Sequence, residues 1–183
     1  LPQLREELKP DIIIVNGENA TNGRGINIKA CKQFYDWGVD CITTGNHIWD
    51  QREIIPHIAK DKKLLRPFNF PPGTPGSGVY KHRLNDGRTI TVVNAMARLF
   101  MDAIDDPFQA INTLLSEEKL GHTTDAIFVD FHGETTSEKL SFAHYIDGKV
   151  TAVIGTHTHI PTADAHILEN GTAYQSDAGM TGD

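Results

Sequence analysis

The chain has 183 residues, of which 39% are hydrophobic and 22% are charged, and its formal net charge is -7. This length suits one domain with a substantial core, and the composition is ordinary for a globular protein. The negative charge argues against a surface that coats nucleic acid, and no apolar run approaches the roughly 20 residues of a membrane span.

The predicted elements alternate between strands and helices, which is typical of an α/β fold. In chain order they are a helix in 1–8, strand 11–15, helix 26–37, strand 39–44, a helix after residue 50, strand 64–70, paired strands 79–84 and 89–93, helix 106–120, strand 126–129, helix 137–145, strand 150–154, and paired strands 166–169 and 172–175. The Asp86-Gly87 and Asn170-Gly171 pairs are hairpin signals, so we expect antiparallel strands beside parallel ones. Asp50 and Glu53 resemble a helix-capping pair.

The whole chain, residues 1–183, is predicted to be a single domain. It opens without Met and stops just after a polar loop, so we expect sequence to be missing at both ends. No signal peptide is visible, and Cys31 and Cys41 form no metal or redox motif. We therefore predict buried free thiols and a cytoplasmic location.

Four predicted strands end in residues that can bind metals. Glu18-Asn19 follows the first, Asn46-His47 the second, Asp130 and His132 a third, and His157 and His159 the fourth. Each pair by itself is also compatible with an ordinary turn or with solvated side chains. Chemistry in open α/β sheets lies at the carboxyl ends of the strands, so the four pairs together favour one shared site.

His157 and His159 are two residues apart after an apolar strand. Because alternate residues of an extended segment point the same way, both imidazoles are expected to contact one object. The mixture of imidazoles with oxygen donors suits iron or manganese, with zinc or magnesium as alternatives.

The number of donors exceeds what one ion needs, so we predict two divalent metal ions. A carboxylate and a hydroxide would bridge the ions, and the hydroxide would attack phosphorus. A histidine beside the ions but not bound to them would protonate the departing oxygen. His47, next to the ligand candidate Asn46, fits that role.

Several motifs resemble those of the bacterial YmdB-like family of calcineurin-like metallophosphoesterases, which are described as cyclic-nucleotide phosphodiesterases. The motifs are Asn16-Gly17-Glu18-Asn19-Ala20, Gly45-Asn46-His47-x-Trp49-Asp50, Asp130-Phe131-His132-x-Glu134-x-Thr136-Ser137-Glu138-Lys139, Gly155-Thr156-His157-Thr158-His159 and Gly179-Met180-Thr181-Gly182. Together with Arg66-Pro67-x-Asn69-Phe70-Pro71, they extend the resemblance over nearly the whole chain.

The resemblance implies a four-layer αββα sandwich with the site at its strand ends. It implies that Glu18 bridges the two metals, that Asn46, His132 and His157 complete one metal site, and that His159 serves the other. His47 would be the proton donor, and Asn19 would help to position phosphate or nucleophile. The family begins with a strand ending in Gly-Asp, which residues 1–10 do not match, so the first strand is expected to be missing.

Three further residues have weaker assignments. Arg98 follows a strand end and could contact phosphate, although a surface salt bridge is an equal alternative. Asp130 and Glu134 could orient His132 without binding the metal themselves, and the alternative is that they cap a loop.

The predicted function is hydrolysis of small phosphodiesters, with 2′,3′- or 3′,5′-cyclic nucleotides as the implied substrates. A non-catalytic nucleotide or metal sensor is the alternative from another class, and a phosphomonoesterase is the alternative enzyme. No membrane or nucleic-acid partner is expected. A homo-oligomer is compatible with the sequence.

Overall fold

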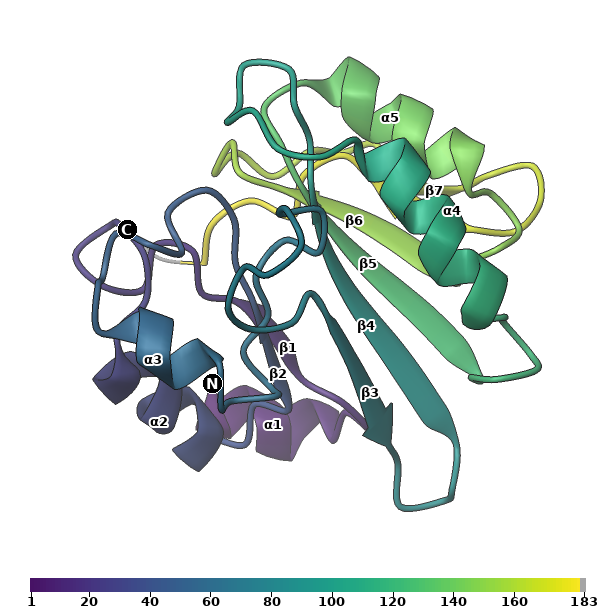
Figure 1. Ribbon diagram of the computed structural model, residues 1–183. Helices are drawn as coiled ribbons and strands as arrows, with labels where there is room; N and C mark the ends of the chain where they lie inside the picture. Colours follow the sequence, from purple (N-terminus) through teal and green to yellow (C-terminus); the bar gives the residue numbers. More distant parts are fainter. Residues whose placement is uncertain (182–183) are drawn as a thin grey trace.

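The computed structural model describes residues 1–181 and contains two β-sheets (Figure 1). The larger sheet has six strands in the order β3 (Val79–Arg83), β4 (Thr89–Met96), β5 (Ala126–His132), β6 (Ala152–Thr156), β8 (Ala173–Gln175) and β7 (His166–Ile167). The smaller sheet pairs β1 (Ile14–Asn16) with β2 (Cys41–Thr43). The helices are α1 (Pro2–Leu8), α2 (Ile28–Asp36), α3 (Ile54–Ile58), α4 (Pro107–Glu117) and α5 (Thr136–Tyr145).

The middle of the larger sheet is parallel. Strand β4 pairs with β5, β5 with β6, and β6 with β8 in parallel, whereas β3 and β7 are added at the edges as antiparallel hairpin partners. The register aligns Met96 with His132 and His132 with Thr156. These three strands therefore end at the same level, and the loops that follow them begin side by side.

Separate apolar clusters hold the helices and the sheets together. Helices α4 and α5 cover one face of the larger sheet (Figure 1), where Phe131 of β5 stacks on Phe142 of α5 with ring centroids 4.0 Å apart. A small cluster that includes Cys41, Leu65 and Val92 joins strands of the two sheets. Helices α2 and α3 belong to a further cluster with the smaller sheet. The site residues thus extend from a rigidly packed scaffold.

The structure confirms a mixed α/β fold, both predicted hairpins, and the buried free thiols of Cys31 and Cys41. Among residues 1–181, no helix combines the length and the apolar character that crossing a membrane would need. The four-layer sandwich, the missing strand and the single domain stay predictions. Gly182 of the last motif lies outside the described residues.

Two local predictions are wrong. Residues 64–70 form no strand, and only Leu64 and Leu65 make isolated bridges, because Pro67 has no N–H to extend the ladder. Asp50 and Glu53 do not form a capping box. Asp50 instead contacts His47, and the Glu53 carboxylate accepts a hydrogen bond from the backbone N–H of Ile28 at the start of α2.

Candidate functional site

Three side chains from different strand ends converge on one point. The Nε2 atom of His132 lies 3.1 Å from Oδ1 of Asn46 and 3.1 Å from Nδ1 of His157. His132 ends β5, His157 follows β6, and Asn46 follows β2 of the smaller sheet. The predicted juxtaposition of these strand ends is therefore present across both sheets.

Thr156 sets the tautomer of His132. Its hydroxyl donates its single proton to Oδ1 of Asp130 at 2.7 Å, so it can only accept a hydrogen bond from Nδ1–H of His132 at 2.9 Å. With the proton on Nδ1, the Nε2 atom presents a lone pair, as a metal-binding histidine does. Burial, followed by the charge of His157, lowers the pKa of His132 well below its usual value, which favours the neutral ring.

Asp130 connects the two sheets beneath the site. Its Oδ2 atom accepts hydrogen bonds from Oγ1 of Thr43 at 2.5 Å and from Nδ2 of Asn16 at 2.9 Å. Thr43 and Asn16 end β2 and β1, so Asp130 aligns both strands of the smaller sheet with β5. Asp130 is linked to His132 through Thr156, and its role in orienting that ring stays a prediction.

His157 also directs a lone pair at the same point. Its Nε2 atom lies 3.0 Å from Oε2 of Glu134. A carboxylate oxygen accepts a hydrogen bond, so the ring proton of His157 lies on Nε2 and Nδ1 is unprotonated. Glu134 therefore orients His157 and not His132 as predicted. With the His157 proton on Nε2, the lone pairs of His132 and His157 and the amide oxygen of Asn46 face one another. A cation among them would stabilise this arrangement.

The spacing of these donors suits a divalent ion. Two ligand atoms that are each about 2.1 Å from one ion stand about 3.0–3.4 Å apart. The two 3.1 Å separations at His132 fall within that interval. Among residues 1–181, no group of three or more His, Cys, Asp or Glu side chains is placed so that it could hold a metal ion. The donors at this point also include the amide oxygen of Asn46. Metal binding itself stays a prediction.

Glu18 is a buried carboxylate beside this cluster. It is 2% exposed, and its Oε1 atom lies 3.5 Å from Nε2 of His132. Its two oxygens accept hydrogen bonds from the backbone N–H groups of Gly45 and His47. Burial, which outweighs these bonds, raises the pKa of Glu18 to about 8. A cation at this position would offset the cost of burying its charge.

His47 lies beside the cluster with one ring nitrogen occupied. Its Nδ1 atom is 2.8 Å from Oδ2 of Asp50, and its side chain is 26% exposed. Because Asp50 accepts the Nδ1 proton, the ring is held in one orientation and Nε2 stays available to a ligand. This arrangement suits a residue that exchanges a proton with a substrate.

His159 does not act as a pair with His157. Its Nε2 atom lies 3.0 Å from Oδ1 of Asn19, whereas His157 contacts Glu134. The predicted extended backbone is wrong, because His157 and His159 have φ values of 114° and 66°. Strand β6 ends at Thr156, and the chain turns immediately afterwards.

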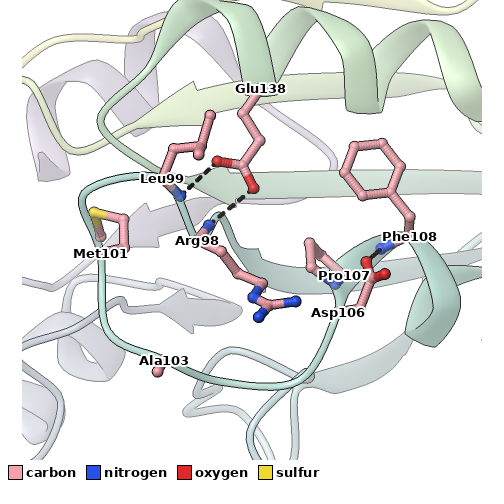
Figure 2. A pocket seen from close by; sticks show the side chains of 8 residues that line it. All are labelled: Arg98, Leu99, Met101, Ala103, Asp106, Pro107, Phe108 and Glu138. Atoms are coloured by element: carbon pink, nitrogen blue, oxygen red, sulfur yellow. Dashed lines mark hydrogen bonds between the residues drawn. The ribbon is translucent and has the colours of Figure 1, made fainter.

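Arg98 lines a separate pocket of about 460 Å³ between the loop after β4 and the starts of α4 and α5 (Figure 2). Its side chain is exposed, and none of the hydrogen bonds within residues 1–181 joins it to the clustered histidines. The structure therefore brings Glu18, Asn46, His132 and His157 together and leaves Arg98 apart.

Sequence reasoning missed Thr156 and the contact between Asp50 and His47. Thr156 gives no signal of its own, because its role depends on pairing β6 with β5 in register. Asp50 was assigned to a helix cap, although its position three residues after a histidine would also have allowed the observed contact.

A sequence model of the family described as YmdB-like protein matches residues 1–183. A Bacillus subtilis protein named 2′,3′-cyclic-nucleotide 2′-phosphodiesterase is 46% identical over 182 residues, which cover 100% of this chain and 68% of that protein. A crystal structure of a hypothetical protein from Thermus thermophilus has a TM-score of 0.92 at 44% identity, and the match covers 100% of this chain and 69% of that one. A structure described as a novel phosphatase from Mycoplasma pneumoniae has a TM-score of 0.86 at 36% identity, and the match covers 97% of this chain and 64% of that one. The chain thus spans about two thirds of the length of these relatives.

Proposed function

Since this chain belongs to the YmdB-like protein family, we propose that it is the core of a metal-dependent phosphodiesterase that hydrolyses small phosphodiesters. The observation that carries the proposal is the convergence of Asn46, His132 and His157 on one point, with the Glu18 carboxylate beside them. The name of the Bacillus subtilis relative supports 2′,3′-cyclic nucleotides as substrates. Whether 3′,5′-cyclic nucleotides are also hydrolysed is part of the same proposal.

We assign the metal ligands as Glu18, Asn46, His132 and His157, with His159 serving a second ion. Iron or manganese suits this mixture of nitrogen and oxygen donors. Bound divalent ions supply positive charge to the phosphoryl oxygens and lower the pKa of water. Asn19, which contacts His159, would help to hold the phosphate.

His47 donates a proton in this proposal. Asp50 fixes the ring through Nδ1, so Nε2–H is free to protonate the ribose oxygen that departs from phosphorus. A departing alkoxide is a strong base, so a proton supplied at that atom lowers the barrier. Asp50 itself keeps the ring oriented and does not contact the substrate.

The test uses the full-length protein, freed of metal with a chelator and reloaded with Mn²⁺ or Fe²⁺. We expect turnover of 2′,3′-cyclic AMP that requires metal and that is abolished in Glu18→Gln, which preserves the side-chain volume but removes the charge. Wild-type turnover by a folded Glu18→Gln variant would overturn the proposal.

A phosphomonoesterase is the second candidate, because the Mycoplasma pneumoniae structure is described as a phosphatase. The same preparation is assayed with 3′-AMP as a monoester substrate. Preference for the cyclic diester supports the first candidate, and preference for the monoester supports the second.

A further inference from the structure

The loop that carries His157 and His159 is strained. Both residues have positive φ values, 114° and 66°, in a region of backbone space that residues with side chains rarely adopt. Such a conformation persists only when its surroundings hold it in place. The geometry of both candidate ligands therefore depends on contacts made by the rest of the protein.

Residues 177–180 supply these contacts. The N–H of Ala178 donates to the carbonyl oxygen of Gly155 at 2.9 Å, and the N–H of Met180 donates to that of His159 at 3.2 Å. Between them, Oδ2 of Asp177 accepts a hydrogen bond from the N–H of Thr158 at 3.0 Å. The Asp177 bond is the one side-chain contact of the three, and it lies between the two histidines.

Asp177 is in turn fixed by a buried cation. Nζ of Lys139 lies 2.9 Å from Oδ2 of Asp177, and the two residues are 0% and 2% exposed. The other carboxylate oxygen, Oδ1, accepts a hydrogen bond from the N–H of Gly179 at 2.8 Å. Lys139 belongs to α5, the helix that packs against β5. The ion pair therefore fixes the Asp177 carboxylate relative to the core, and the carboxylate in turn fixes the loop at Thr158.

We propose that Lys139 and Asp177 are positioning residues for His157 and His159, and that they preset the loop for metal binding by holding the N–H of Thr158. This inference rests on the proposed function, because it assigns a purpose to the ligands named there. Neither residue is among the metal ligands assigned above, so both would act through the loop. The buried charge pair keeps the strained loop in its ligating geometry before any ion arrives.

The neighbouring residue Glu138 provides a matched control. Its carboxylate is also buried, at 8% exposed, and accepts hydrogen bonds from the backbone N–H groups of Arg98 and Leu99 at 2.9 and 2.8 Å (Figure 2). It therefore anchors a different loop, the one that follows β4, through the same kind of backbone contact. Glu138→Gln and Asp177→Asn remove the same charge from comparable surroundings.

The experiment compares the full-length wild type with Asp177→Asn, Lys139→Met and Glu138→Gln. Circular dichroism first establishes the temperature range in which each variant is folded. Within that range, calorimetric titration gives the Mn²⁺ affinity, and hydrogen exchange by mass spectrometry gives the protection of peptides that contain residues 156–160 in the metal-free protein.

We expect Asp177→Asn and Lys139→Met to bind Mn²⁺ about 10-fold to 100-fold more weakly, the range typical of groups that orient metal ligands. Exchange in 156–160 should be faster in both, whereas Glu138→Gln should keep wild-type affinity. If Asp177→Asn does not fold, Lys139→Met decides the matter, because it leaves the Thr158 acceptor in place but frees it from α5.

Wild-type affinity and exchange in a folded Asp177→Asn or Lys139→Met variant would overturn the inference. So would a wild-type Thr158 amide that exchanges as fast as an unstructured peptide. A wild-type protein that binds no Mn²⁺ at all would instead contradict the proposed function, so the two failures are distinguishable.

Discussion

The hydroxyl oxygen of Thr156 lies 2.9 Å from Nδ1 of His132 while its proton goes to Asp130. This chain of hydrogen bonds from His132 through Thr156 to Asp130, here called the relay, exists because β5 and β6 are parallel and pair His132 with Thr156 in register. A packed sheet thus determines which nitrogen of a buried imidazole carries its proton. The ligating lone pair of Nε2 is a consequence of strand pairing.

Thr156→Val should weaken metal binding, because valine has the same shape but cannot accept the Nδ1 proton. We expect Mn²⁺ affinity to fall about 10-fold and the free energy of unfolding to fall by about 1–3 kcal/mol, because Asp130 loses a hydrogen-bond donor in a buried position. Calorimetric titration and urea unfolding measure the two effects. Thr156→Ser keeps the hydroxyl and should bind Mn²⁺ like wild type, and equal affinities in all three proteins would contradict the relay.

His47→Ala should separate chemistry from metal binding. Mn²⁺ affinity should stay near wild type, while kcat for a 2′,3′-cyclic nucleotide should fall about 10²- to 10⁴-fold, the usual contribution of a general acid. An activated diester with p-nitrophenolate as its leaving group needs no proton, so its kcat should change far less. Asp50→Asn should lie between wild type and His47→Ala, and an equal loss on both substrates would argue against proton donation by His47.

Gly45→Ala should displace His132. A Cβ atom at residue 45 would overlap the Cδ2 and Nε2 atoms of that ring, at separations that real Cβ atoms essentially never show. We expect a variant that binds Mn²⁺ at least about 10-fold more weakly, as measured by titration of the folded protein. Gly87→Ala is the control for backbone effects, since its new methyl group meets nothing within 4 Å. It should lose some stability and no affinity.

The two thiols should be inert in the native protein. Burial, with a smaller contribution from Asp61, raises the pKa of Cys31 to about 12, and burial likewise raises that of Cys41. A raised pKa means that little thiolate is present at about pH 8, so alkylation should be slow until the protein unfolds. Mass spectrometry after iodoacetamide treatment, with and without urea, measures this. Rapid labelling of the native protein would show that the thiols are accessible.

The strand-end clusters could be predicted from the sequence because short apolar runs and turn residues are local signals. They placed Glu18, Asn46, His132 and His157 correctly at the ends of neighbouring strands. Parallel pairing brings the end of β1 beside that of β2 and the end of β5 beside that of β6. The contact between the two sheets then brings these two pairs together. The hairpins at Asp86-Gly87 and Asn170-Gly171 were equally local and are also confirmed.

The remaining features depend on contacts that no local pattern encodes. The turn after Thr156 is held by Asp177, which is 19 residues from Thr158, so the extended geometry expected from spacing alone was wrong. Asp130 contacts Thr43 across 87 residues, and that separation hides the link between the sheets. The 64–70 segment has strand-like composition, but Pro67 and the loop around Arg66 override it.

Anomalous diffraction from crystals of the full-length protein loaded with Mn²⁺ tests the central claim most directly. The account predicts a manganese peak within bonding distance of His132 Nε2, His157 Nδ1 and Asn46 Oδ1, with the Glu18 carboxylate as a further ligand. Saturating Mn²⁺ with no anomalous peak among these four side chains would contradict it.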